Sequence, residues 1–360
     1  MAHSLCVYGS CPHTGGVTRA LFVAGRGSSP TDGLHYFSES DGTWSGRLLA
    51  TVDQLAALCW HPSLDIVYGL AGLRRGTMHA WGVAGIEAGV SAALAERDSL
   101  GDIPCDLAVT PEGRMLVAAN FGFNAGVGIG SLTTWALDEN GIPEAEGTRL
   151  DLPGGSLVDA EIQASGHPHQ IVFHDGLLYV PDYGADLIHR FGYRGGELIE
   201  ISPIVAPAGS APRHIVMLPG ERAVASAELA GAVIAGGLEG EWVEIADSSR
   251  ERGGARGRHP KNYPGDIKPS LDRRHVYLAN RGYETIATFA VDGATPELVA
   301  EIDSGTAWPQ HLLVSGDELL VAGWDSSTVA ALPLVDGIPG PARTLFECAG
   351  AGWLLEARTS

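Results

Sequence analysis

The stretch Gly209-Ser-Ala-Pro-Arg-His-Ile-Val-Met-Leu-Pro-Gly-Glu-Arg-Ala-Val-Ala-Ser-Ala-Glu-Leu229 decides how the rest of the chain is interpreted. It holds two short apolar runs, Ile215 to Leu218 and Ala223 to Ala227, on either side of a Pro-Gly pair. Proline lacks an N–H and glycine tolerates positive φ, so the pair favours a turn and the runs favour strands. The resulting hairpin would bring three ionisable residues to one end: Arg213, His214 and Glu228.

Composition favours a soluble globular protein and disfavours a nucleic-acid partner. The 360 residues are 45% hydrophobic and 18% charged, and 43 acidic residues outnumber 23 basic ones. A net charge of −20 disfavours nonspecific nucleic-acid binding, which depends on Lys and Arg. We find no signal-peptide pattern and no apolar run long enough to span a membrane, so no membrane partner is expected. Five scattered cysteines without a CxxC motif favour free thiols and a cytoplasmic location.

The hairpin pattern recurs along the chain. Each copy has a proline, one or two polar residues and an apolar strand, and the copies start 44 to 64 residues apart: Pro104, Pro168, Pro212, Pro264 and Pro309. Leu55 to Pro62 is a degenerate earlier copy. Repeats of this length with about four strands are typical of β-propeller blades. We therefore predict an all-β, seven-bladed β-propeller with four-stranded antiparallel blades, forming a single domain over residues 1–360. A non-propeller repeat or two stacked β domains is the alternative.

The two ends of the chain predict how the ring closes. Ala349 to Glu356 resembles an innermost strand with no blade after it, and Ser4 to Gly9 resembles a second strand with no innermost strand before it. Because an open ring would leave unpaired strand edges, we expect the C-terminal strand to join the N-terminal blade. A short helix over Val90 to Asp98 is also compatible with the pattern.

A propeller would gather polar residues from distant copies at one mouth of its channel, because the innermost strands line that channel. The starts of the innermost strands contribute Cys105, Asp106, His169, Gln170, Arg213, His214, Gly265, Asp266, Gln310 and His311. The ends of the second strands contribute Asn120, Asp182, Glu228, Asn280, Arg281, Trp324 and Asp325. The competing interpretation is a hydrogen-bonded channel with structural roles only.

Three segments resemble a known family, the lactonase-type seven-bladed propellers. They are Gly166-His-Pro-His-Gln-Ile-Val172, Ala211-Pro-Arg-His-Ile-Val216 with Ala227-Glu228, and Asp266-Ile-Lys268 with Tyr277-Leu-Ala-Asn-Arg281. The family includes bacterial 6-phosphogluconolactonases and fungal carboxymuconate-lactonising enzymes. The resemblance covers about residues 50–356, and it implies an active-site set with no cofactor or metal: His169, Arg213, Glu228 and Arg281. The insertion from Cys11 to Asp32 and the Ala-Glu-Leu triplet at Glu228 depart from the family pattern.

These residue types suit hydrolysis of a small anionic lactone. Glu228 can serve as the base for water, and His169 can supply a proton, since its unperturbed pKa is near neutrality. Arg213 and Arg281 can hold an anionic group or the oxyanion. Four further residues are expected to bind substrate: Gln170, His214, Asp266 and His311. The alternatives are lactonisation of a muconate-like substrate, a noncatalytic binding propeller, and a structural ion pair between Glu228 and Arg213.

Other motifs give weaker signals. A metal site at His167, His169 and His174 would need three convergent side chains, and calcium at Asp106, Asp182 and Asp266 would need oxygen ligands from three blades. Gly126 to Gly130 does not precede a helical pattern, so a dinucleotide site is not expected. Arg250 to Lys261 is a basic, Gly-rich tract expected to form an exposed loop, with a lid over an anionic substrate as its functional alternative.

Overall fold

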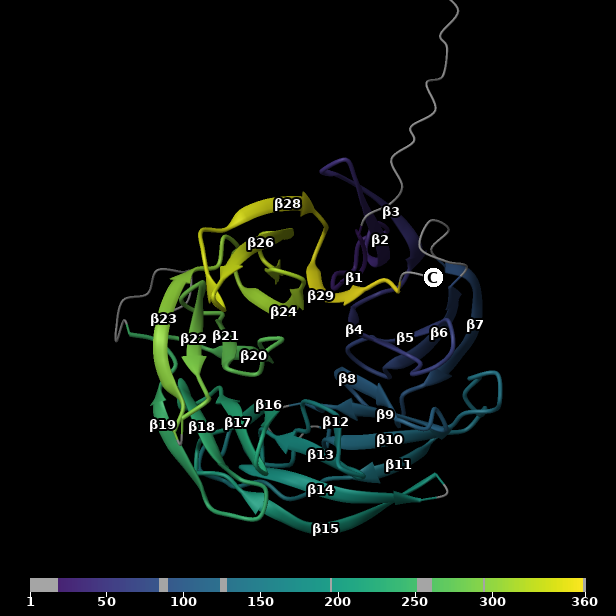
Figure 1. Ribbon diagram of the computed structural model, residues 1–360. Helices are drawn as coiled ribbons and strands as arrows, with labels where there is room; N and C mark the ends of the chain where they lie inside the picture. The colour runs from purple at the N-terminus through teal and green to yellow at the C-terminus, as the bar shows by residue number, and fades with distance from the viewer. Residues whose placement is uncertain are drawn as a thin grey trace, which may run out of the picture.

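Seven antiparallel sheets surround a common centre (Figure 1). The computed structural model describes residues 19–83, 90–123, 128–194, 196–250, 261–293 and 295–358. These ranges contain 29 strands and no helix, and hence no helix long and apolar enough to cross a membrane. The predicted all-β, seven-bladed propeller is therefore confirmed.

Each blade has four strands from the centre outward. The first contains β29 (Ala351–Glu356), β1 (Arg19–Gly25), β2 (Gly33–Ser40) and β3 (Thr43–Thr51). The second contains β4 (Leu55–Trp60), β5 (Ile66–Ala71), β6 (Thr77–Val83) and β7 (Val90–Asp98). The third contains β8 (Pro104–Val109), β9 (Met115–Asn120), β10 (Ser131–Ala136) and β11 (Thr148–Asp151). The fourth contains β12 (Val172–His174), β13 (Leu177–Asp182), β14 (Leu187–Arg194) and β15 (Glu197–Val205).

The remaining three blades continue the same order. The fifth contains β16 (Pro212–Leu218), β17 (Arg222–Ala227), β18 (Ala232–Gly237) and β19 (Trp242–Asp247). The sixth contains β20 (Pro264–Pro269), β21 (His275–Asn280), β22 (Thr285–Ala290) and β23 (Glu297–Asp303). The seventh contains β24 (Pro309–Ser315), β25 (Glu318–Gly323), β26 (Thr328–Val335) and β28 (Arg343–Glu347), with the short β27 (Ile338–Pro339) also paired to β26.

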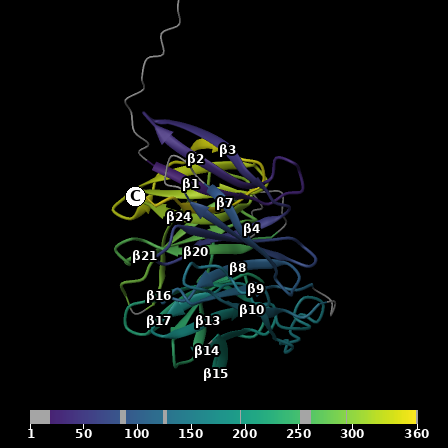
Figure 2. The same ribbon diagram turned by 90° about the vertical axis from the view of Figure 1, so that its right-hand side faces the viewer.

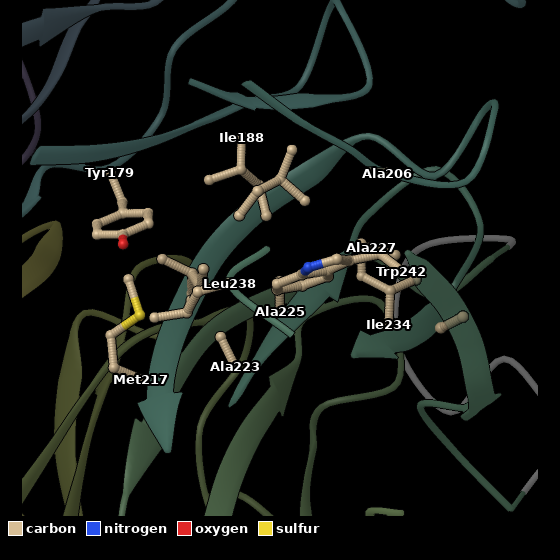
Figure 3. Packing of buried hydrophobic residues seen from close by; sticks show 13 residues of the cluster. Tyr179, Ile188, Ala206, Met217, Ala223, Ala225, Ala227, Ile234, Leu238 and Trp242 are labelled. Carbon is tan, nitrogen blue, oxygen red and sulfur yellow. The ribbon is translucent and has the colours of Figure 1, made fainter. Parts of the chain in front are cut away.

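Burial decreases from the centre of the ring to its rim, which explains the sequence pattern. Every residue of β16 is buried, whereas most residues of the outermost strand β15 are exposed or half-buried. Facing sheets of adjacent blades pack apolar side chains between them. Figure 3 shows the packing between the fourth and fifth blades, where Tyr179 and Ile188 meet Met217, Ile234 and Trp242. The inner strands therefore need continuous apolar runs, and the outer strands do not.

The C-terminal strand closes the ring, as predicted. β29 pairs antiparallel with β1, with Val23 opposite Leu354, so it is the innermost strand of the first blade. In Figures 1 and 2 the purple N-terminal strands lie beside the yellow C-terminal ones. The second strand of this blade is β1 rather than the expected residues 4–9, which lie outside the described residues.

Val90–Asp98 is a strand and not the short helix that the pattern allowed. It is the outer strand of the second blade and pairs with β6, with Thr77 opposite Asp98. An isolated helix of nine residues gains little in water, because helix nucleation is costly. Pairing with an existing sheet edge supplies the backbone hydrogen bonds instead.

A β-bulge begins the innermost strand of the fifth blade. Pro212 pairs with Ala227, but the next pair is Ile215 with Ala225, so Arg213 and His214 lie opposite one residue. Register shifts occur at the same place in β8, β20 and β24. Adjacent side chains of a regular strand point to opposite faces, and a bulge changes their direction. Arg213 Nη1 lies 3.2 Å from His214 Nε2 as a result.

Candidate active site

A repeated backbone hydrogen bond places one residue of every blade at the same mouth of the channel. In each blade, the residue after the second strand donates its N–H to a backbone carbonyl oxygen at the start of the innermost strand. The acceptor is the residue directly before that strand, and in the fourth blade it is the residue before the isolated bridge of Pro168 with Asp182. The donor–acceptor pairs are Arg26–Gly350, Gly72–Gln54, Phe121–Ile103, Tyr183–His167, Glu228–Ala211, Arg281–Tyr263 and Trp324–Trp308, at 2.8 to 3.2 Å. We call the seven donors Arg26, Gly72, Phe121, Tyr183, Glu228, Arg281 and Trp324 the mouth ring.

Glu228, a member of this ring, lies between two arginine side chains. Its Oε2 is 3.1 Å from Arg213 Nε and also contacts Arg281 Nη2. Arg213 starts the same hairpin that Glu228 ends, and Arg281 comes from the next blade. The side chains of Arg213, Arg281 and Glu228 are 3%, 8% and 15% exposed. The structure thus brings together three of the four residues that the family resemblance implies.

Two cations share one carboxylate, which leaves the cluster with an excess of positive charge. Burial, together with the charge of Arg281, lowers the pKa of Arg213 to about 10, while Glu228 opposes the change. Arg213 therefore remains a cation at neutral pH. Arg213 Nε and Arg281 Nη2 are buried and both lie against Glu228 Oε2, but neither N–H is aligned with this oxygen for a hydrogen bond. An anionic ligand or a developing oxyanion can supply the acceptor that these donors lack.

His169, the fourth residue of the set, lies beside this cluster. Its ring packs edge-to-face on His214 at 5.2 Å between centroids and on Phe121 at 5.7 Å. Its Nδ1 is buried without a hydrogen-bond partner. Burial holds the pKa of His169 well below its ordinary value, and Arg213 adds to this effect. The ring is therefore neutral at physiological pH, so the premise of an unperturbed pKa does not apply, and it offers one N–H and one lone pair.

The four predicted substrate-binding residues, Gln170, His214, Asp266 and His311, form hydrogen bonds with other groups of the protein. Gln170 Oε1 accepts from Ile215 N–H, Asp266 Oδ2 from Leu312 N–H and His311 Nδ1 from Leu354 N–H, each in the next blade. Asp106 Oδ2 similarly accepts from Ile171 N–H. We call these four side chains the inter-blade pins: Asp106, Gln170, Asp266 and His311. A contribution of Gln170, Asp266 and His311 to substrate binding stays a prediction.

His214 joins the pins through Asp266. Its Nδ1 lies 2.7 Å from Asp266 Oδ1, which also accepts from Lys268 Nζ at 3.0 Å. Burial, together with the charge of Arg213, lowers the pKa of His214 to about 3 despite the opposing effect of Asp266. Burial would raise the pKa of Asp266, but Lys268 and His311 hold it well below its ordinary value. A neutral imidazole therefore separates the Glu228 cluster from a buried Asp–Lys pair.

The candidate metal ligands do not converge. His167 Nδ1 lies 2.6 Å from the Phe121 carbonyl oxygen, and His174 pairs with Asp175 at 3.4 Å. Asp182 faces His189 at 3.0 Å, whereas Asp106 and Asp266 are inter-blade pins. Within the described ranges, no group of three or more His, Cys, Asp or Glu residues is placed to hold a metal ion. Two segments lie partly outside those ranges: residues 126–130, where no dinucleotide site is expected, and residues 250–261, the expected exposed loop with a lid as its alternative.

Sequence reasoning missed part of the mouth ring. It names Glu228, Arg281 and Trp324 but none of the other four members, which are Gly72 and three residues with large side chains, Arg26, Phe121 and Tyr183. In several blades it uses the last residue of the second strand instead of the residue after it. Arg26 was hidden in the atypical N-terminal segment. A strict alignment of the second-strand ends would have identified all three.

A cavity of about 570 Å³ adjoins the ring at Gly72. Residues from the first three blades line it, including Asp53, Arg74, Arg75 and Phe123. The Arg74 guanidinium lies 4.2 Å from the Phe123 ring centroid. Arg213, Glu228 and Arg281 are not among its lining residues, so the cavity is separate from their cluster.

The seven blades make this protein a seven-bladed β-propeller with a cationic cluster at one mouth of the channel. Comparison with known sequences gives its family. Residues 34–337 match the family model described as "Lactonase, 7-bladed beta-propeller", and the chain belongs to this family. The 6-phosphogluconolactonase of Bacillus subtilis is 28% identical over 229 residues. An uncharacterized protein of Staphylococcus saprophyticus is 30% identical over 186 residues. These alignments cover 61% and 48% of this chain, and 62% and 50% of the two relatives.

Solved structures share the fold over almost the whole chain. The periplasmic gluconolactonase of Pseudomonas aeruginosa superposes with a TM-score of 0.84 at 21% identity, covering 95% of this chain and 99% of that protein. A putative 6-phosphogluconolactonase from Bacteroides fragilis gives 0.79 at 21% identity, covering 97% and 100%. At this identity the likeness concerns the fold alone.

Proposed function

We propose that the protein hydrolyses a small anionic sugar lactone, with 6-phosphogluconolactone as the first candidate, at the mouth ring. The observation that carries the proposal is Glu228 held between Arg213 and Arg281 beside a neutral His169. Membership of the lactonase family and the 6-phosphogluconolactonase of Bacillus subtilis support the reaction type. The cationic cluster supports an anionic substrate, although the protein as a whole is acidic.

Glu228 acts as the base in the proposed mechanism. It takes a proton from water while the water oxygen bonds to the lactone carbonyl carbon. When the ring C–O bond breaks, Glu228 returns the proton to the departing ring oxygen, and the product is the open hydroxy acid. One carboxylate therefore serves both steps, and no protonated histidine is required.

The other three residues of the set stabilise charge and orient the ester. Arg213 and Arg281 carry buried N–H groups that face Glu228 Oε2 without an aligned hydrogen bond, and one of these groups stabilises the oxyanion of the tetrahedral intermediate. A donor in such a position typically contributes about 10²–10³ in kcat. The neutral His169 donates or accepts one hydrogen bond to the substrate through its unpartnered ring nitrogen.

We also propose a cytoplasmic location. Cys59, Cys105 and Cys348 are free thiols, and burial raises the pKa of Cys105 and of Cys348 to about 12 in each case. Unpaired, unreactive cysteines suit a reducing compartment.

A panel of lactones tests the proposed function. Purified protein is mixed with 6-phosphogluconolactone, glucono-δ-lactone and a muconolactone, and acid release is followed in a pH-stat. We expect turnover of at least one sugar lactone above the spontaneous rate. Loss of muconate absorbance, with no sugar lactone hydrolysed, would replace hydrolysis with lactonisation. Unchanged substrates throughout would reject an enzymatic role for this site.

A further inference from the structure

Arg26 occupies the same position in the first blade that Glu228 and Arg281 occupy in the fifth and sixth. It follows β1 directly, and its N–H donates to the Gly350 carbonyl oxygen at 2.8 Å, which is the mouth-ring hydrogen bond. Its own carbonyl oxygen accepts from Trp324 Nε1 at 3.0 Å. Both backbone polar groups are therefore fixed, and the side chain begins from a rigid point of the ring.

The charge of Arg26 is not neutralised by the groups around it. Its guanidinium carbon lies 4.9 Å from the centroid of the Trp324 ring, and its Nε is buried without an acceptor. Among the residues that the structure describes, no carboxylate forms an ion pair with Arg26. Asp32, the nearest acid along the chain, instead accepts from Ser29 N–H at 2.7 Å.

Arg26 belongs to the same electrostatic environment as the Glu228 cluster. Burial lowers the pKa of Arg26, and Arg281 lowers it further, while Cys105 opposes the change. Cys105 also interacts with Arg213, and its sulfur lies 3.6 Å from the His169 carbonyl oxygen. A half-buried cation without a counter-ion is costly unless a ligand supplies the anion. Gly72, the next ring member, has no side chain, and it is one of the residues that line the 570 Å³ cavity.

We propose that Arg26 is a specificity-determining residue that binds the phosphate of a phosphorylated sugar lactone, while Arg213 and Arg281 act at the ester. The inference rests on the proposed lactonase function, and it separates two tasks that three arginines share. Arg213 and Arg281 flank the base, so their positions suit the reacting carbonyl group. Arg26 lies on the opposite side of the ring from the base, where a distal anionic substituent would lie.

Two variants test the assignment. Arg26→Met removes the charge and keeps an apolar stem for Trp324, whereas Arg26→Lys keeps the charge without the planar fork. We compare kcat/KM for 6-phosphogluconolactone with kcat/KM for glucono-δ-lactone. Arg26→Met should lower the ratio roughly 10- to 100-fold, which is the range for a hydrogen-bonded charge pair, and Arg26→Lys should retain part of it. The matched control is Arg274→Met, at a side chain that is 65% exposed and pairs with Asp292.

Calorimetry of product binding separates this inference from the proposed function. Wild-type protein should bind 6-phosphogluconate more tightly than gluconate, and Arg26→Met should lose this preference while its thermal unfolding midpoint stays close to that of Arg274→Met. An unchanged preference in Arg26→Met overturns the inference, even where the lactones are hydrolysed. If no lactone is hydrolysed, the proposed function fails, but loss of phosphate-dependent binding in Arg26→Met still supports the site. Wild-type protein that binds neither acid overturns both.

Discussion

Glu228 is the proposed base and also the ion-pair partner of two arginines, and substitution can separate these two roles. Glu228→Gln keeps the shape of the side chain but removes the negative charge between Arg213 and Arg281. We expect kcat for the hydrolysed lactone to fall at least about 100-fold, because the variant cannot accept a proton from water. Binding of 6-phosphogluconate should persist or tighten, because the two guanidinium groups lose their competing carboxylate.

The control for this substitution is Glu197→Gln on the exposed outer strand β15. It removes one negative charge from the acidic surface and should leave kcat within about twofold. If Glu228→Gln keeps most of the wild-type kcat, Glu228 is a structural partner of the arginines and another group activates the water.

His169 gives a second prediction, concerning pH. Because burial and Arg213 hold the pKa of His169 well below its ordinary value, the ring stays neutral as pH falls from 8 to 6. The kcat/KM profile should therefore show no loss with a midpoint near 6.5, the ordinary histidine value. Initial rates between pH 5.5 and 8 provide the measurement. A midpoint near 6.5 that disappears in His169→Gln would show that the ring titrates normally.

At the scale of strands and blades, the inter-blade pins connect electrostatics to stability. His311 Nδ1 accepts a hydrogen bond from Leu354 N–H, and Gln170 Oε1 accepts one from Ile215 N–H between another pair of blades. Burial and Lys268 hold the pKa of His311 well below 6.5. Below pH 6.5 the His311 imidazole is therefore protonated in the unfolded chain but stays neutral in the folded chain. The free energy of unfolding consequently falls as pH decreases.

His311→Gln isolates this term, since glutamine can keep the hydrogen bond without titrating. We expect the unfolding free energy of wild type to fall more steeply between pH 6.5 and 5, by up to about 1.4 kcal/mol per pH unit for one proton. At pH 8 the variant should lose the stacking of His311 on Trp353, with ring centroids 4.1 Å apart, and the 3.7 Å contact of Nε2 with Asp266 Oδ2. Denaturant unfolding at several pH values measures both, and parallel curves for the two proteins would contradict the assignment.

Local signals predicted the strands well and their irregularities poorly. The turn at Pro219-Gly220 and its flanking apolar runs predicted β16 and β17 to within a few residues. The bulge that reorients the side chains of Arg213 and His214 cannot be recognised from the alternation of polar and apolar residues, because it depends on the pairing of β16 with β17. Val90–Asp98 was ambiguous for the same reason, since its conformation is set by β6.

At the scale of the whole molecule, the repeat predicted which distant residues meet. The common phase of the copies predicted that Arg213, Glu228 and Arg281 would gather at one mouth, and their contacts confirm it. Arg26 escaped this argument because its blade is assembled from both ends of the chain. The hydrogen bond from Arg26 N–H to the Gly350 carbonyl oxygen joins two residues near opposite ends of the sequence, and no local sequence pattern predicts it.

Closure of the ring by β29 gives the last prediction. β29 pairs with β1, and its Leu354 is 1% exposed, packed in a cluster with Val23, Leu320 and Ala331 of the first and seventh blades. Leu354→Ala should lower the unfolding free energy by roughly 2–5 kcal/mol, the usual cost of such a cavity. Leu150→Ala on the outer strand β11, where the side chain is 37% exposed, is the control and should cost less than about 1 kcal/mol.

Deleting residues 351–360 is the more severe form of the same test. It uncovers the buried strand β1, which would then present an unpaired apolar edge. We expect an aggregation-prone protein with a lower thermal midpoint, and a variant lacking only residues 359 and 360 should behave as wild type. If the larger deletion melts like the full-length protein, β1 is stabilised without β29. The position of Arg26, which depends on Gly350 and on this closure, would then need another explanation.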